Sequence, residues 1–415
     1  MKTEYDVIIV GARIAGASLA YELGRAGYKV LLVDKANFPS DVLSTHNFFN
    51  NSVAMLREMG VLGKLLATGT PTYKRAYVRL EEAVIDGDFP EANGETECLC
   101  IRRTHLDRIL LEHAAAVPGV AVLEGFRVAG LLRSGETVTG IEGVNAGGEA
   151  VSFRSRLVVG ADGRRSAVRR MAGSRRLAAV PTDFASYVGY FRHFRQEGEP
   201  CAEFYRMGEY LAIVFPTSDQ LHVVGLMFPL SWSRMLESMK QDPEGTFRHA
   251  VRTGFGRVSF ADRLSRSELA GPIRGLNGYD NDWHEAMGKG WALTGDALSF
   301  KDPAVGQGMH DALFAAKALT GVLVSHDDWA ASWDRMAESY GRIMNGKTRP
   351  LFELACAMTR NVPVTPEQTA VNWLIGIHPE AKRAFLGMYN HTNGPEELER
   401  VIGGIMSGGA ANERE

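Results

Sequence analysis

The stretch DVIIVGARIAGASLAYEL, residues 6–23, decides the fold. Its apolar, β-branched start predicts a buried parallel strand, and the apolar positions from Ile14 onward recur at helical spacing. KVLLVDKA, residues 29–36, predicts a second buried strand that ends at Asp34, where a carboxylate can accept hydrogen bonds from an adenosine ribose. This order of elements indicates a dinucleotide-binding βαβ unit: a strand, a glycine turn, a helix and a second strand that ends in an acidic residue.

The glycine turn of this unit departs from the G-x-G-x-x-G pattern at one position. Gly11 and Gly16 are present, but Arg13 replaces the second glycine, which normally lets the backbone approach a pyrophosphate. A side chain fits there if it points away from that contact, and a guanidinium offers planar donors to phosphate oxygens. Two interpretations of Arg13 remain open, along the diphosphate or into solvent. The predicted cofactor-binding residues of this unit are Gly11, Arg13, Ala15, Gly16, Asp34 and Lys35.

Two later segments also run from an apolar strand into a polar turn. RLVVGADGRRSAVRRMAG, residues 156–173, predicts a strand that ends at Asp162 and Gly163, followed by a helix from about Ser166. Residues 290–323, GWALTGDALSFKDPAVGQGMHDALFAAKALTGVL, predict a strand that ends at Asp296, a glycine-containing loop, and an amphipathic helix from about Met309.

These three segments, in this order, resemble the FAD-binding motifs of the para-hydroxybenzoate-hydroxylase-like flavoprotein superfamily. That superfamily includes aromatic monooxygenases, flavin-dependent halogenases and geranylgeranyl reductases, and the resemblance covers roughly residues 6–323. It implies an α/β (α+β) fold, with a Rossmann-like FAD-binding domain, an inserted antiparallel-sheet substrate domain and a helical C-terminal segment. It also implies that Asp296 accepts a hydrogen bond from the ribityl chain of FAD. The helix N-terminus near Met309 would stabilise negative charge on the reduced flavin.

The same resemblance implies further cofactor contacts. Asp162 and Gly163 would lie close to the cofactor and the reductant. In CIRRTHLDRILLEHA, residues 100–114, the R-x-x-L pattern implies that Arg103 contacts the diphosphate or the ribityl chain. The alternative is a solvent-facing arginine on an amphipathic helix. The loop after Asp296 adds Pro303, Gly306, Gly308 and Met309 as predicted cofactor-binding residues.

The loop NFPSDVLSTHNF, residues 37–48, together with the KDP of residues 301–303, resembles a bacterial subgroup of FAD-dependent oxidoreductases or monooxygenases. Many hydroxylases place an arginine about ten residues after the ribose acid, whereas this chain has Ser44, Thr45 and His46 there. His46 would face the flavin or the diphosphate, or it is a loop histidine bonded to backbone, and both interpretations stay open.

Residues 171–271 alternate apolar and polar positions, which predicts an antiparallel sheet. In the superfamily such a sheet binds the substrate, with Phe215 and Pro216 beside the flavin, and residues 72–97 are expected to add strands. The candidate pocket residues are Phe191, Arg192, His193, Tyr205, Tyr210, Phe215, His222 and Met227. Residues from 342 onward are predicted to be helical and to pack against the body of the protein, with a frayed tail from residue 407.

The predicted domain division is discontinuous. Residues 1–71, 98–178 and 272–345 form the FAD-binding domain, residues 72–97 and 179–271 form the substrate sheet, and residues 346–415 form the C-terminal helical segment.

The resemblance implies an FAD-dependent monooxygenase that uses NAD(P)H and O₂. It would hydroxylate or epoxidise a small organic substrate, an aromatic compound or a secondary metabolite, through a flavin C4a-hydroperoxide. The predicted catalytic residues are His46, Tyr210, Phe215 and Lys301. Since no second nucleotide-binding motif is present, the nicotinamide would bind transiently at the flavin, or a partner flavin reductase would supply electrons. The alternatives are a halogenase, a geranylgeranyl-type double-bond reductase and a non-enzymatic flavin-binding protein. YLAIVFP, residues 210–216, lacks the halogenase W-x-W-x-I-P motif.

Composition narrows the class of protein. With 46 basic and 49 acidic residues among 415, the net charge of −3 argues against nucleic-acid binding. No uninterrupted apolar run approaches the roughly 18 residues of a membrane span, and no signal peptide is recognised. The four cysteines suggest no metal site and agree with a reducing compartment, so a cytoplasmic protein is expected.

Overall fold

The computed structural model describes residues 4–40 and 46–412. The predicted βαβ unit is confirmed as β1 (Glu4–Val10), α1 (Ile14–Arg25) and β2 (Val30–Val33). Because residues 7–10 of β1 are buried on both faces, the strand can be apolar throughout, and it pairs in parallel with β2 and β11.

The first sheet has eight strands in the order β20-β21-β11-β1-β2-β8, with β10 and β9 continuing from β11. Its further strands are β8 (Val120–Leu123), β9 (Arg127–Ser134), β10 (Thr137–Val144), β11 (Ala150–Gly160), β20 (Met287–Gly288) and β21 (Trp291–Leu293). Helices α4 (Arg103–Ala115) and α9 (Gly308–Val324) pack beside α1. The second and third motifs therefore have the predicted strands, β11 beside β1 and β21 beside β11.

The second sheet also has eight strands, in the order β17-β13-β16-β15-β14-β5-β6, with β18 on β13. The strands are β5 (Arg75–Leu80), β6 (Ala83–Asp88), β13 (Phe184–Arg192), β14 (Cys201–Met207), β15 (Tyr210–Pro216), β16 (His222–Pro229), β17 (Glu268–Leu269) and β18 (Arg274–Asn277). The expectation that residues 72–97 add strands is confirmed, because β5 pairs with β14 and β6 pairs with β5.

Shorter elements connect the two large sheets. A three-stranded sheet contains β3 (Asn47–Phe48), β4 (Thr72–Tyr73) and β7 (Cys98–Cys100), and another contains β12 (Arg176–Pro181), β19 (Asp280–His284) and β22 (Ser299–Phe300). The remaining short elements are α2 (Asn50–Glu58), α3 (Leu62–Leu66), α5 (Ala167–Ala172), η1 (Ser218–Gln220), η2 (Gly295–Ala297) and η3 (Pro303–Val305).

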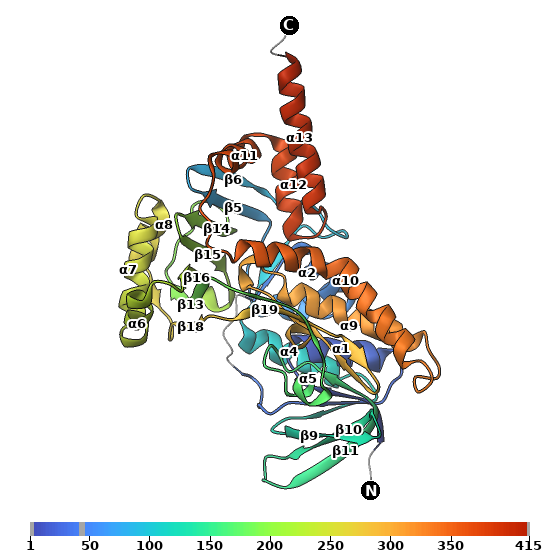
Figure 1. Ribbon diagram of the computed structural model, residues 1–415. Helices are drawn as coiled ribbons and strands as arrows, with labels where there is room; N and C mark the ends of the chain where they lie inside the picture. The colour runs from blue at the N-terminus through green and yellow to red at the C-terminus, as the bar shows by residue number, and fades with distance from the viewer. Residues whose placement is uncertain (1–3, 41–45, 413–415) are drawn as a thin grey trace.

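Three helices that the sequence analysis did not predict cover the outer face of the second sheet. They are α6 (Ser233–Gln241), α7 (Pro243–Phe255) and α8 (Ser259–Ser265), and Figure 1 shows them together beside β13 and β16. Their apolar residues form one core cluster with alternate residues of β13 to β16. The predicted substrate domain is thus a sheet with one face already covered.

The C-terminal part is helical as predicted, with α10 (Trp333–Met358), α11 (Pro366–Ile377), α12 (Pro379–Tyr389) and α13 (Pro395–Asn412). Helices α11 and α12 pack on β6, and α13 projects from the body (Figure 1). The prediction of a frayed tail from residue 407 is wrong for residues 407–412, because α13 continues to Asn412. The predicted boundary between residues 345 and 346 lies inside α10. Among the described residues, no helix combines the length and apolarity needed to span a membrane.

Candidate functional site

The three motifs meet at one end of the first sheet. Gly11 has a φ of +104°, and a Cβ atom on it would lie 2.4 Å from the carbonyl oxygen of Ala161 in the second motif. A Cβ atom on Gly295, in the third motif, would lie 2.8 Å from the Cβ atom of Ala15. The predicted convergence of the three segments is therefore confirmed, and it depends on glycine where backbones come closest.

The first turn is held against the end of β2. Asp34 accepts hydrogen bonds from the backbone nitrogens of Ala12, at 2.7 Å, and Ala36, at 2.8 Å. A Cβ atom on Gly16 would lie 1.7 Å from the carbonyl oxygen of Gly11, so only glycine permits this close entry into α1. Each carboxylate oxygen of Asp34 keeps a second lone pair for a ligand. Lys35 is exposed.

Two arginines and a buried carboxylate lie beside this turn. Asp107 is 0% exposed, and its Oδ1 accepts from Nε and Nη2 of Arg103 at 2.9 and 2.8 Å. Arg13 Nε lies 3.8 Å from Asp107 Oδ2, and Arg13 Nη2 lies 3.4 Å from Ser40 Oγ. Burial lowers the pKa of the Arg13 guanidinium, and the positive charge of Arg103 lowers this pKa further. Neither arginine points freely into solvent. Because two cationic side chains share the single carboxylate of Asp107, the cluster keeps a net positive charge that can bind a diphosphate.

Asp296 supplies an acceptor on the other side of the turn. Its half-buried carboxylate has no hydrogen-bond partner within residues 4–40 and 46–412, and a Cβ atom on Gly308 would lie 3.8 Å from its Oδ1. Burial raises the pKa of Asp296, whereas the positive charge of Lys301 lowers it. Pro303 begins η3, Gly306 has a φ of +66°, and Met309 lies buried in the first turn of α9.

These residues fit FAD. The glycine turn and the arginine pair suit a diphosphate, and the carboxylates of Asp34 and Asp296 suit sugar hydroxyls. The N-terminus of α9 directs free backbone N–H groups toward the same space.

Asp162 has a second, structural role. Its Oδ2 accepts from the backbone nitrogens of Ala167 at 2.7 Å and Val168 at 3.3 Å, and its Oδ1 contacts the Ser166 hydroxyl. These bonds cap the N-terminus of α5. Gly163 follows with a φ of +79°. A contact of either residue with the cofactor stays a prediction.

His46 connects the loop after β2 to the second sheet. Its Nε2 is hydrogen-bonded to the Tyr190 hydroxyl, and the two rings stack with centroids 5.6 Å apart. Burial lowers the pKa of His46 well below its ordinary value, so the imidazole is neutral. Ser44 and Thr45, named with it in the sequence analysis, lie outside the described residues.

Lys301 belongs to a buried polar cluster that the sequence pattern does not predict. Its ammonium contacts Asp311 Oδ2, and Asp311 Oδ1 lies 3.0 Å from Nδ1 of His310. The ring of His310 stacks on His391, whose Nε2 lies 2.7 Å from Oε1 of Gln307. Burial lowers the pKa of His391 to about 3. One ligand atom each from His310, Asp311 and His391 lies within 4.8 Å of the others, a possible metal-ligand set. Because the Lys301 ammonium already contacts Asp311, we treat the group as a hydrogen-bonded cluster.

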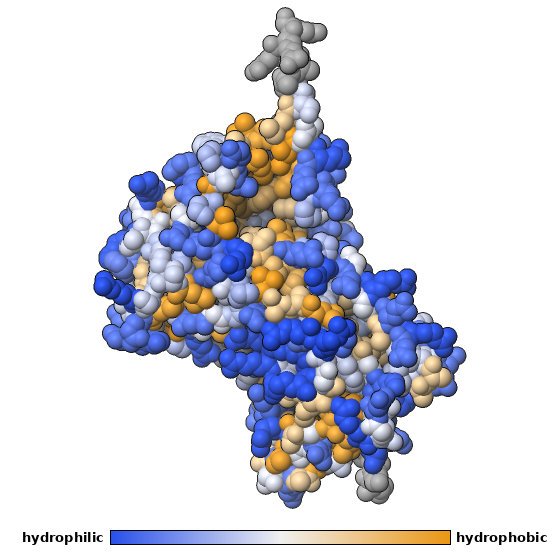
Figure 2. Space-filling view, viewed as in Figure 1, coloured by the Kyte–Doolittle hydropathy of each residue, from blue (hydrophilic) through white to orange (hydrophobic). Residues whose placement is uncertain are grey.

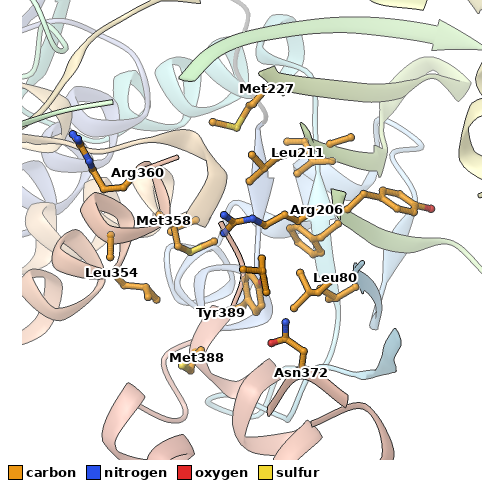
Figure 3. Close-up of a pocket in the computed structure, with 18 of the residues that line it drawn as sticks. Leu80, Arg206, Leu211, Met227, Leu354, Met358, Arg360, Asn372, Met388 and Tyr389 are labelled. Carbon is orange, nitrogen blue, oxygen red and sulfur yellow. The ribbon is translucent and has the colours of Figure 1, made fainter. Parts of the chain in front are cut away.

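A cavity of about 540 Å³ lies between the second sheet and the C-terminal helices (Figure 3). Its walls come from β5 and β13–β16 on one side and from α10–α12 on the other. Pro303, Val305 and Gln307 line it as well, so the cavity borders the loop that precedes α9. Figure 2 shows an apolar hollow over the C-terminal helices.

The structure decides which candidate pocket residues face this cavity. Met227 lines it, and Phe215 packs edge-on against the lining residue Phe204. Tyr210 packs against Trp232 and Phe255 under α6 and α7. Tyr205 borders the cavity, although it also belongs to the α6–α8 core cluster. The remaining candidates do not line the cavity: Phe191 belongs to the same core cluster, His222 lies beside Phe194, and Arg192 and His193 are exposed.

The placement of Tyr210 corrects a prediction. Its ring lies under the covering helices and does not line the cavity, so its position does not support the predicted catalytic role. The physical reason is that alternate residues of a strand point to opposite faces, and α6–α8 cover the face that Tyr210 occupies.

A family model described as an FAD binding domain matches residues 4–190. A 1H-pyrrole-2-carbonyl-[peptidyl-carrier protein] chlorinase of Pseudomonas fluorescens is 26% identical over 83% of this chain and 81% of its own length. A 6-methylpretetramide 4-monooxygenase of Streptomyces rimosus is 34% identical over 40% of each chain. Among solved structures, the flavin-dependent brominase Bmp2 superposes with a TM-score of 0.79 at 17% identity over 100% of both chains, which shows a shared fold.

The matched family and the relatives, together with the fold and the geometry of the site, show that the protein is an FAD-dependent oxidoreductase. Residues 4–190 match the FAD binding domain family, and the relatives include monooxygenases, a halogenase and a double-bond reductase, which agrees with the resemblance to the para-hydroxybenzoate-hydroxylase-like superfamily.

Proposed function

We propose that the protein is a monooxygenase that uses NAD(P)H and O₂ to hydroxylate or epoxidise a small, largely apolar organic substrate. The observation that carries this proposal is the cavity of about 540 Å³ that reaches Pro303, Val305 and Gln307 beside α9. Its volume suits a small organic molecule. When bound, FAD supplies the redox chemistry between the nicotinamide, O₂ and the substrate.

The chain itself contributes binding and orientation. Arg13 and Arg103 hold the diphosphate, and the first turn of α9 stabilises negative charge at the flavin edge. The apolar walls from β14–β16 and α10–α12 hold the substrate beside the η3 loop and keep bulk water away from the reacting atoms. Neutral His46 positions this loop region through Tyr190.

Phe215 and Lys301 also keep supporting roles in this proposal. Phe215 packs against the lining residue Phe204 and against Tyr73, so it supports the cavity wall from behind. Lys301 fixes Asp311 on α9 and lies within electrostatic reach of Asp296.

Halogenation is the second candidate, and the similarity to the chlorinase over most of both chains favours it. Two observations favour oxygen transfer instead. The Lys301 ammonium is held by Asp311, and β15 has neither tryptophan of the halogenase motif.

One set of assays separates these reactions. The purified FAD-containing protein is screened for compounds that stimulate NADH or NADPH oxidation, and products are analysed by mass spectrometry under ¹⁸O₂. We expect one oxygen-18 atom in the product. A halogenated product that requires chloride or bromide would assign the protein to the second candidate. Anaerobic saturation of an alkene would make it a reductase. Turnover that begins only after a flavin reductase is added would identify a partner as the electron source.

A further inference from the structure

The cavity between the second sheet and the C-terminal helices is apolar on nearly every side. Sheet residues such as Leu80, Leu211 and Met227 face Leu354, Met358 and Tyr389 from the helices (Figure 3). Such a surface binds aliphatic or aromatic groups through the hydrophobic effect.

Arg206 interrupts this apolar surface. It lies on β14, and Figure 3 shows its guanidinium reaching in among Leu211, Met358 and Tyr389. An arginine has five N–H donors. Within the described residues, Nη2 donates to the carbonyl oxygen of Val362 at 2.9 Å, and the buried Nε has no partner.

The positive charge of Arg206 also lacks a paired carboxylate within residues 4–40 and 46–412. Glu81 lines the cavity, but its Oε1 accepts from the backbone nitrogen of Gly208 at 2.6 Å. By contrast, Arg360, the other arginine in the wall, has its Nε 3.3 Å from Asp183 Oδ2. Burial lowers the pKa of Arg206, and the negative charge of Glu81, which forms no ion pair with Arg206, offsets this lowering only in part.

We propose that the cavity binds an apolar organic monocarboxylate whose carboxylate pairs with the guanidinium of Arg206. Nη1 makes no hydrogen bond within the described residues, and the end of the guanidinium can therefore donate to a carboxylate while the apolar walls hold the rest of the molecule. A neutral ligand can accept a hydrogen bond from the guanidinium but supplies no negative charge to pair with it, so it should bind less tightly than a carboxylate. A ligand with two negative charges would find no second unpaired cation among the described residues of the cavity wall, because Arg360 is paired with Asp183. The inference rests on the proposed function in that it takes this cavity as the substrate site.

The test uses the FAD-containing protein and two probes of equal chain length, decanoate and 1-decanol. Binding is measured by isothermal titration calorimetry near pH 7.5, without nicotinamide. We expect decanoate to bind at least about tenfold more tightly than 1-decanol, in line with a charge-assisted pair.

Variants assign this preference to one side chain. Arg206→Met keeps an apolar stem and removes the charge, and we expect it to abolish the preference for decanoate while 1-decanol affinity stays within about twofold of wild type. Arg206→Lys retains part of the preference. Arg192→Met, an exposed arginine on β13 of the same sheet, serves as the control and retains all of it. Circular dichroism melting confirms that each variant is folded, and Arg206→Lys carries the test if Arg206→Met is not.

Three results would overturn the inference. The wild type could bind both probes with equal affinity, Arg206→Met could keep the preference for decanoate unchanged, or neither probe could show saturable binding. The proposed function fails separately. A protein that prefers decanoate through Arg206 but never transfers oxygen refutes only the monooxygenase proposal. Oxygen transfer without any preference for carboxylates refutes only this inference.

Discussion

Replacing Arg103 by methionine tests the electrostatics of the cofactor site most directly. Arg103 is 8% exposed and Asp107 is 0% exposed, and two guanidinium nitrogens bind Oδ1 of Asp107 at 2.8 and 2.9 Å. The other carboxylate oxygen lies 3.8 Å from Arg13 Nε, beyond hydrogen-bond distance. The variant therefore leaves a fully buried carboxylate with one distant cation.

The magnitude follows from this geometry. Removing one partner of a buried ion pair costs about 3–5 kcal/mol, and because Arg13 remains, we expect about 3 kcal/mol of unfolding free energy at pH 8. Burial raises the pKa of Asp107, and Arg103 is the main group that lowers it, so the variant raises this pKa further. A carboxylate whose folded pKa exceeds its unfolded pKa loses stability as pH rises. The loss should therefore be smaller near pH 5.5 than at pH 8.

The assay is urea unfolding of the FAD-free protein at both pH values, followed by tryptophan fluorescence. The double variant Arg103→Met with Asp107→Leu should recover most of the stability, because a buried pair replaced by apolar side chains is often neutral. It should not recover FAD affinity, since the guanidinium that we propose binds the diphosphate is still missing. Arg108→Met is the control, because its pair with Glu112 is exposed and contributes less than about 0.5 kcal/mol.

Two results would refute this reasoning. A loss below about 0.5 kcal/mol at pH 8 would show that the Arg103–Asp107 pair does not compensate a buried charge. Full recovery of FAD affinity in the double variant would remove Arg103 from the cofactor contacts.

Three further predictions concern single positions. Gly16→Val should abolish FAD binding, measured by flavin fluorescence, because the new Cβ atom would overlap the carbonyl oxygen of Gly11. Gly63→Ala is the control and should bind FAD normally, because a Cβ atom at position 63 meets no neighbouring atom within 4 Å. Burial lowers the pKa of His222 to about 4, below its unfolded value, so its contribution to stability is complete above about pH 6.5 and is lost as pH falls toward 4. Urea unfolding of His222→Asn should show a shallower decline over this range, and an unchanged decline would exclude His222 as a cause. Tyr210→Phe should leave substrate-stimulated NAD(P)H oxidation within twofold of wild type, and a larger loss would return Tyr210 to the active site.

The amino-acid sequence by itself determined the three cofactor segments. The βαβ unit at residues 4–33, the strand before Asp162 and the strand and helix around Asp296 have the predicted form. Hydrophobic periodicity and glycine turns are local properties, so a short window of sequence contains the whole signal.

Only the tertiary structure decided which groups act together. Alternation along β13–β16 defines two faces, but the packing of α6–α8 decides that Tyr210 is covered and that Met227 and Arg206 face the cavity. Likewise, Gln307 and His391 lie far apart in sequence and meet because α12 packs beside the cofactor loop. Contacts of this kind depend on how whole elements pack, and side-chain spacing within one element contains no information about the surface that will cover it.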